Sequence, residues 1–343
     1  MQIIGHRDIR DFLLKSAAEG CLAPSYLFVG PRGVGKSLMA RWMAQCTFCS
    51  SSGERPCGGC SSCQRMESGS YPDYKYAERL VNLGAKRGII GQVREIIDDL
   101  QTMPYEGSCR FFAFNEAGAL NEQSQNALLK TVEEPPSHLV LILIAESLGS
   151  ILPTIVSRCC VVRFNAVERA ELADALVQRG CEPQRAEVLA AISGGAPGRA
   201  LQMLQDERSW AFRLEVLRNL TQLPGSDMWE ALELALSLEE LVPSKSAAKA
   251  AAVEEAAFQP DLSGILDIAA SYYRDAMVLA AGADHSEIVN CDCLDALAAL
   301  AQGRGALGLE KDLRRINEAY EHLGSNVQAR LWLQHLCLGL TDA

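Results

Sequence analysis

One short loop limits what this chain can fold into more than any other feature of its 343 residues. It fits the pattern G-x-x-x-x-G-K-[ST] without deviation, as Gly30-Pro31-Arg32-Gly33-Val34-Gly35-Lys36-Ser37. An apolar run at residues 26–29 comes before it, and residues 36–46 after it have the apolar spacing of one helical face. A strand, a glycine loop and a helix in this order are the context expected of a phosphate-binding loop, and they disfavour a chance glycine turn.

Each part of the loop suits a nucleotide. The glycines let backbone N–H groups close around phosphate oxygens, and the start of the helix adds a partial positive charge. Lys36 would reach the β- and γ-phosphates, while Ser37 would ligate Mg²⁺. We therefore expect ATP and Mg²⁺ to bind here, although a loop of this kind can also hold a nucleotide without hydrolysing it.

The first half of the chain has an α/β pattern. Strand-like runs are expected at residues 110–115, 139–145 and 159–164, and a helix capped by Asn121 should run to residue 134 before two prolines. Strands that alternate with helices favour a parallel sheet covered on both faces. Beyond residue 164 the strand signals nearly vanish, and the rest is expected to be helical. The helices should break at Gly180, residues 194–198, Pro224-Gly225, Pro243, Pro260 and Gly282. The Ala-rich residues 247–257 suit either a surface helix or a flexible connection.

The second expected half of a nucleotide site follows the apolar strand that starts at residue 110. Phosphate-loop ATPases end this strand with Asp-Glu, but here the pair is Asn115-Glu116. An amide oxygen is neutral, so Asn115 removes a full negative charge from the metal position. Glu116 remains available as a base or a water-orienting group. We favour nucleotide binding with slow or absent turnover over a working ATPase with a tolerant metal site, because the metal neutralises much of the charge in phosphoryl transfer.

A cluster of cysteines interrupts this pattern. Cys57, Cys60 and Cys63 form two overlapping C-x₂-C units, which suit three ligands of a tetrahedral Zn²⁺ ion. We expect Cys49 to be the fourth ligand and keep Cys46 as the alternative, although Cys46 falls on the apolar face of the preceding helix. Four thiolates close a zinc site, so its role would be structural. The competing interpretation is a set of free cytosolic thiols.

Composition excludes several classes of protein. The net charge of −11 argues against a chain whose main task is to grip a phosphate backbone, so a DNA contact is expected to be shared with partners. The 13 cysteines are an odd number, and the first residues, MQIIGHRDIR, have no signal-peptide pattern, which together disfavour a secreted disulfide framework. No apolar run approaches the length of a membrane span. We expect a cytoplasmic protein.

Taken in order, these features resemble one family over about residues 1–210. The matching segments are Tyr26-Leu-Phe-Val-Gly-Pro-Arg-Gly-Val-Gly-Lys36, the cysteine insertion, Tyr71-Pro-Asp73, Met103-Pro-Tyr105-Glu-Gly107, Asn126-Ala-Leu-Leu-Lys-Thr-Val-Glu-Glu-Pro-Pro136 and Leu152-Pro-Thr-Ile-Val-Ser-Arg-Cys159. They are similar to the bacterial clamp loaders, which include the gamma/tau motor subunit and the delta-prime subunit of DNA polymerase III.

The resemblance implies three domains. These are a RecA-like AAA+ domain at residues 1–165 with a zinc module at about 46–66, a helical lid at 166–210 and an all-α collar at 211–343. It also implies partners: gamma/tau and delta-type subunits in a hetero-pentameric ring that loads a sliding clamp on primed DNA. Arg158 matches an arginine finger that enters the neighbour's ATP site, which a permanently charged guanidinium suits. A local ion pair is the competing role for Arg158.

Further matches and departures refine this interpretation. Arg199 lies in a segment similar to the lid motif that senses the γ-phosphate, although a solvated arginine is also compatible with it. After the strand at 139–144, the family's polar sensor would have to be replaced by Glu146 or Ser147. The altered sensor positions, together with Asn115 and the absence of a long C-terminal extension, favour a delta-prime type of subunit with weak or absent ATPase activity. A gamma/tau-type ATPase is the first alternative, and an unrelated AAA+ remodeller or helicase loader is the second.

Overall fold

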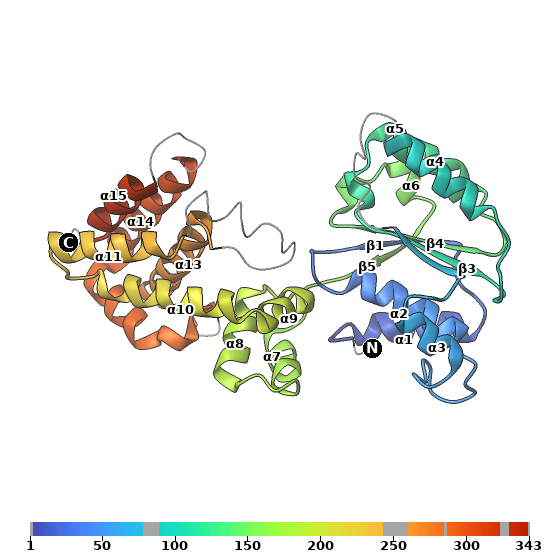
Figure 1. The fold of residues 1–343 in the computed structure, drawn as a ribbon, viewed down its shortest axis with the longest axis horizontal. Helices are drawn as coiled ribbons and strands as arrows, with labels where there is room; N and C mark the ends of the chain where they lie inside the picture. Colours follow the sequence, from blue (N-terminus) through green and yellow to red (C-terminus); the bar gives the residue numbers. More distant parts are fainter. Residues whose placement is uncertain (1–2, 78–88, 243–259, 285–286, 323–328, 342–343) are drawn as a thin grey trace. The chain divides into compact units, whose positions relative to one another are not determined.

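The computed structural model describes residues 3–77, 89–242, 260–284, 287–322 and 329–341. The chain divides into two compact units. One comprises Met1–Leu172 with Gly195–Arg199, and the other comprises Ala173–Gly194 with Ala200–Ala343. The first contains the sheet and the second contains most of the C-terminal helices (Figure 1).

The first unit is built on a five-stranded parallel sheet. Its strands are β1 Ser25–Val29, β2 Tyr74–Ala77, β3 Arg110–Phe114, β4 Leu139–Ala145 and β5 Cys160–Arg163, in the spatial order β2-β3-β4-β1-β5. The expected strands are confirmed to within two residues, and β2 is an additional edge strand. The parallel sheet agrees with the expected fold class, and the glycine loop leaves an interior strand, β1.

Helices cover both faces of this sheet (Figure 1). On one face lie α1 Arg7–Ala18, α2 Lys36–Phe48 and α3 Ser61–Glu67; on the other lie α4 Ile89–Leu100, α5 Glu122–Glu133 and α6 Pro153–Val156, with the short turns η1 Ala117–Ala119 and η2 Leu148–Ser150.

Alternate residues of each strand face opposite sides. Tyr26 and Phe28 pack in the cluster with α2, whereas Leu27 and Val29 pack in the cluster with α5. Apolar residues on both faces explain why these strands read as continuous apolar runs.

Local signals set the ends of α5. The Asn121 side chain accepts a hydrogen bond from the backbone N–H of Ser124 at 2.9 Å, as a residue that caps a helix does. The helix ends at Glu133, ahead of Pro135. Both ends agree with the expectation from the sequence, and they place Glu133 beside the segment that follows α6.

A fully buried carboxylate shapes the loop that enters β3. Asp73 accepts backbone N–H bonds from Tyr105, Glu106 and Gly107 at 2.7–2.9 Å. Burial alone would raise the pKa of Asp73, but these three donors and the charge of Arg110 together bring it below its ordinary value. Two of the segments that carry the family resemblance are thus joined to each other.

The second unit contains no strand among its described residues, as expected. Its helices are α8 Pro183–Ile192, α10 Glu207–Gln222, α11 Met228–Glu240, α13 Leu262–Ala280, α14 Leu294–His322 and α15 Ala329–Thr341, with the turn η4 Cys291–Cys293. Two further helices, α7 Arg169–Val177 and α9 Pro197–Gln205, run across the division between the units. Gly180, Gly225 and Gly282 lie just beyond helix ends, as predicted. Pro243 and the Ala-rich residues 247–257 lie outside the described residues. The proposed lid and collar boundaries remain predictions.

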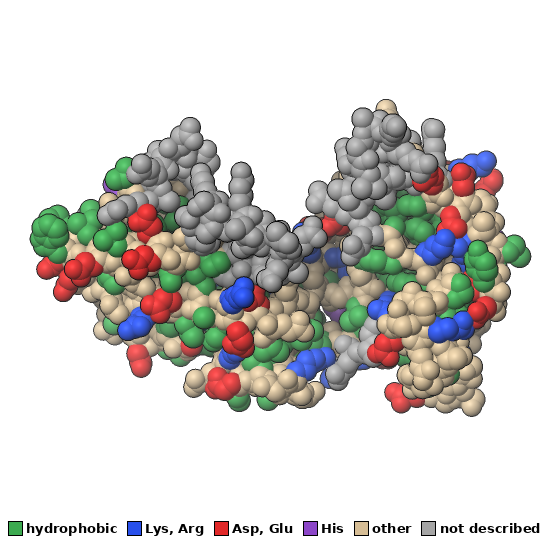
Figure 2. All heavy atoms as spheres, in the orientation of Figure 1, with side chains coloured by type: hydrophobic (Ala, Val, Ile, Leu, Met, Phe, Trp, Pro, Cys, Tyr) green, Lys and Arg blue, Asp and Glu red, His purple; other side chains and the backbone are tan. Residues whose placement is uncertain are grey.

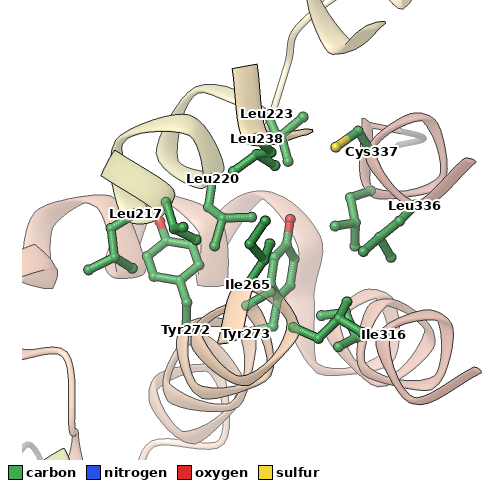
Figure 3. Close-up of a cluster of buried hydrophobic side chains, with 14 of the residues drawn as sticks. Leu217, Leu220, Leu223, Leu238, Ile265, Tyr272, Tyr273, Ile316, Leu336 and Cys337 are labelled. Carbon is green, nitrogen blue, oxygen red and sulfur yellow. The ribbon is translucent and has the colours of Figure 1, made fainter. Parts of the chain in front are cut away.

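Side chains from several helices form the core of the second unit (Figure 3). Tyr272 and Tyr273 of α13 are fully buried and lie between leucines of α10 and apolar residues of α14 and α15. Burying large aromatic and aliphatic side chains of this kind is the main source of folding free energy. None of the described helices is both long and apolar enough to cross a membrane.

A polar network lies beside this core. Arg213 of α10 donates two hydrogen bonds to the Asp292 carboxylate at 2.7 and 2.8 Å and a third to Asn290 Oδ1 at 2.9 Å. Asn290 in turn donates through its backbone and side-chain N–H groups to Asp275 of α13 at 2.7 and 2.8 Å. Buried polar groups need such partners, and here they join α10, α13 and the segment that leads into α14.

Candidate nucleotide pocket and metal centre

The glycine loop has the backbone that its motif predicts. Gly33 and Gly35 have φ angles of 80° and 104°, a left-handed region that glycine enters without the steric cost met by other residues. Helix α2 starts at Lys36, so the loop ends at a helix N-terminus, where backbone N–H groups are free to face an anion. These residues fit the phosphates of a nucleotide, although nucleotide binding itself remains a prediction.

Lys36 is held inside this loop. Its ammonium donates to the carbonyl oxygens of Gly30 and Pro31 at 2.6 and 2.7 Å. Burial lowers the pKa of Lys36, while the charge of Glu146 opposes that shift. The cation is therefore pre-positioned among the loop carbonyls, in the loop that would surround the phosphates.

The metal half of the pocket lies at the end of β3. The backbone N–H of Asn115 donates to Ala77 O at 2.9 Å, which joins this end to β2. Glu116 has a left-handed backbone (φ 51°), and its carboxylate lies 3.5 Å from the guanidinium of Arg32. Hence the base candidate contacts the phosphate loop of its own chain. The two candidate sensors, Glu146 and Ser147, follow β4 and are both exposed.

The structure adds one residue that the sequence patterns did not single out. The Tyr76 hydroxyl of β2 donates a hydrogen bond to Ser37 Oγ at 3.3 Å. No motif marks Tyr76, because it lies on an edge strand of only four residues, too short for a periodic pattern to be recognised. It brings a phenol next to the hydroxyl that was expected to ligate Mg²⁺.

Arg199 lies close to the phosphate loop through its backbone. The N–H of its neighbour Gly198 donates to Gly33 O at 2.8 Å, and a Cβ added at Gly33 would lie 3.4 Å from the Arg199 nitrogen. The Arg199 side chain is exposed. The structure thus brings the sensor-like segment to the glycine loop, as the resemblance implies, while its contact with a γ-phosphate stays a prediction.

Arg158 lies at the junction of α6 and β5. Its guanidinium contacts the Glu133 carboxylate of α5 at 3.0 Å and donates to Thr154 O at 3.0 Å. The side chains of Arg158 and Glu133 are 41% and 45% exposed, so the pair lies at the surface of this chain. Exposed ion pairs contribute only about 0–1 kcal/mol, so this contact holds the arginine only weakly.

Four cysteines converge next to α3. The Sγ atoms of Cys49, Cys57, Cys60 and Cys63 all lie within 4.8 Å of one another. Tetrahedral zinc with thiolate ligands at about 2.3 Å requires sulfur atoms about 3.8 Å apart, so a small contraction completes the site. Backbone N–H groups of Cys57, Cys60 and Cys63 point at the sulfurs of Cys49, Cys57 and Cys60 at 3.4–3.5 Å. Such bonds stabilise thiolates, the form that binds metal.

Cys46 is not part of this group. It lies on the side of α2 that packs in the core, and burial raises the pKa of its thiol to about 12. Cys49, at the C-terminal cap of α2, lies where the backbone becomes extended, which directs it towards the C-x₂-C units. The expected ligand set is therefore the one that the structure assembles.

We predict that protein purified under reducing conditions contains about one zinc ion per chain, the number that four thiolates hold. Cys49→Ser should abolish zinc retention because serine supplies no thiolate. Cys46→Ala is the matched control and should retain the metal. Metal analysis of the three proteins provides the test, and zinc loss from Cys46→Ala alone would reverse the ligand assignment.

Known proteins resemble this chain along most of its length. Family models described as the DNA polymerase III delta subunit and its C-terminal part match residues 5–168 and 238–341. Over 228 residues the chain is 33% identical to the delta-prime subunit of DNA polymerase III from Pseudomonas aeruginosa, which covers 62% of this chain and 68% of that protein. The chain belongs to the DNA polymerase III clamp-loader family.

Two further sequence relatives agree with this assignment. The delta-prime subunit of Bacillus subtilis is 23% identical over 97% of this chain and 95% of its own length. The tau subunit of Escherichia coli is 30% identical, but the match covers 59% of this chain and only 32% of tau. A solved gamma-related protein from Thermotoga maritima shares 15% identity over 96% of this chain and 98% of its own, with a TM-score of 0.40. The family models and the sequence relatives confirm the resemblance that the motifs indicate.

Proposed function

We propose that this clamp-loader chain is a delta-prime-type subunit that donates Arg158 to the ATP site of a neighbouring subunit. The full-length match to a delta-prime subunit supports the type. The exposure of Arg158 and its weak local pair with Glu133 support the role in trans. Its partners would be gamma/tau and delta-type subunits in a five-membered ring that loads a sliding clamp on primed DNA.

One observation supports a minor catalytic role for the chain's own pocket. The phosphate-binding part at residues 30–37 is complete, whereas Asn115 supplies no carboxylate at the metal position. Mg²⁺ accompanying ATP would be held by Ser37 and Asn115, two neutral ligands. Mg²⁺ prefers carboxylates and neutralises much of the charge in phosphoryl transfer, so we infer that ATP binds but is hydrolysed slowly or not at all.

The charge on the surface agrees with DNA contact through the complex. On the face shown in Figure 2, Lys and Arg side chains are separated by acidic and uncharged ones over both units, and the described residues form no continuous basic area there. Electrostatic binding of a phosphate backbone requires clustered cations. Among the described residues, the face shown thus lacks the clustered cations of a phosphate-backbone site, which agrees with a proposed task within the ring.

A gamma/tau-type motor is the second candidate, because Glu116 and the complete phosphate loop are retained and tau is 30% identical over 209 residues. ATP hydrolysis separates the two. We expect the isolated chain to hydrolyse ATP no faster than a preparation of its Lys36→Ala variant. Turnover that disappears in Lys36→Ala but persists in Lys15→Ala, an exposed lysine on α1, would establish the motor role instead.

A further inference from the structure

The hydroxyl that should ligate the metal already has a partner in this chain. In metal-dependent phosphate loops the serine oxygen binds Mg²⁺ directly. Here the Tyr76 hydroxyl donates to that oxygen, Ser37 Oγ, at 3.3 Å. A hydroxyl oxygen has two lone pairs. The tyrosine uses one of them and draws electron density from the other, which weakens Ser37 as a metal ligand.

The sheet determines where Tyr76 lies. Parallel pairing sets Tyr76 beside Ala113 and Ala77 beside Phe114, so β2 and β3 end together. The backbone bond from Asn115 to Ala77 continues that pairing past the end of β3. Tyr76 is 38% exposed, and its hydrogen bond to Ser37 lies at the surface of the chain. Hence Tyr76 and Asn115 are presented from neighbouring strands at the edge of the sheet that carries the metal half of the pocket.

Two features therefore act against the same cation. Asn115 leaves the metal position without the negative charge of an aspartate, and Tyr76 occupies a lone pair of Ser37. Phosphate binding does not depend on either residue, because the Lys36 ammonium and the N-terminus of α2 supply positive charge independently. The pocket retains its attraction for phosphates while its attraction for the metal is reduced.

We propose that Tyr76 is a specificity-determining residue of the nucleotide pocket. Because of Tyr76, the pocket binds a nucleoside triphosphate with an affinity that depends little on a divalent cation. This inference rests on the proposed nucleotide binding and adds that the nucleotide binds with or without Mg²⁺. Tyr76 acts through Ser37 and is a positioning residue.

The test compares ATP affinity in excess Mg²⁺ with ATP affinity in EDTA, measured by calorimetric titration of the full chain. For the native chain the ratio of the two affinities should stay within about threefold, below the effect of one hydrogen bond to a charged group. Tyr76→Phe should raise the ratio in favour of Mg²⁺ by about five- to tenfold, since it frees the Ser37 lone pair. Adding Asn115→Asp to Tyr76→Phe should raise it further, because a carboxylate joins the metal site.

Tyr74→Phe is the matched control, since it removes a phenolic hydroxyl two residues earlier on the same strand. Its ratio should equal that of the native chain. A native ratio that already favours Mg²⁺ strongly and does not change in Tyr76→Phe would overturn the inference while the nucleotide pocket stands. No ATP binding by any of these proteins in either buffer would overturn the inference together with the proposed nucleotide binding.

Discussion

Replacing Arg158 with alanine is expected to lower ATP turnover at the neighbouring site of the assembled ring by about 10³-fold or more, the usual contribution of an arginine finger. A 10³-fold loss corresponds to about 4 kcal/mol of transition-state stabilisation. The pair that holds Arg158 within its own chain is exposed on both sides, and such a pair contributes only about 0–1 kcal/mol. The gain at the neighbour's phosphates therefore exceeds the cost of leaving Glu133.

ATP hydrolysis and clamp loading by a ring reconstituted with each variant measure this effect. Arg158→Lys keeps the charge but loses the planar fork of donors, so it should recover only part of the activity. Glu133→Ala removes the local partner and leaves the arginine, and should retain nearly full activity. If a ring with Arg158→Ala loads clamps at the native rate, the finger role is contradicted. The ion pair with Glu133 would then be the remaining role of Arg158.

Replacing Arg213 with methionine is expected to destabilise the second unit by about 3–5 kcal/mol, the cost of removing one partner from a buried ion pair. Methionine matches the length of the arginine stem, so the loss reports mainly on the charge. Asp292, whose side chain is 18% exposed, would lose both of its guanidinium bonds, and Asn290 Oδ1 would lose its donor in a buried site.

Denaturant unfolding measures the change in the free energy of unfolding. Arg218→Met is the matched control, since Arg218 lies on the same helix, is 71% exposed and contacts Glu215 only at 3.9 Å. Its effect should stay within about 0.5 kcal/mol, as for most surface substitutions. Equal effects of the two substitutions would show that the buried network contributes no more than a surface pair.

Local chemistry made much of the first unit predictable. The strands β1 and β4 are buried on both faces, so apart from Ser25 their residues are apolar, and Asn121 marks the start of α5 by its own side-chain bond. The edge strand β2 escaped prediction because its four residues are only partly covered. These residues form a strand because they pair with β3, and this pairing depends on the whole fold and not on the local sequence.

The residues of the candidate sites also fall into those that local spacing reveals and those that only the fold brings together. Spacing identified Cys57, Cys60 and Cys63, but the choice between Cys49 and Cys46 depended on which side of α2 faces the core. Residues brought together by the fold alone could not be found. Tyr76 and Ser37 are 39 positions apart, and Arg213 and Asp292 are 79 apart. Separations of this size carry no periodic signal.

The buried carboxylate of Asp73 has a consequence for how this loop can change in sequence. All three of its bonds are donated by backbone, so the identities of residues 105 and 106 do not affect them. Gly107 is constrained instead, since an added Cβ would lie 3.1 Å from Phe48 and 3.2 Å from Cys109 O. Asp73 and Gly107 constrain the backbone of the loop, and Glu106 also pairs with Arg65 at 2.6 Å, whereas Tyr105 is 75% exposed. The side chain at position 105 can therefore change, by evolution or by design, without altering the backbone path of this loop.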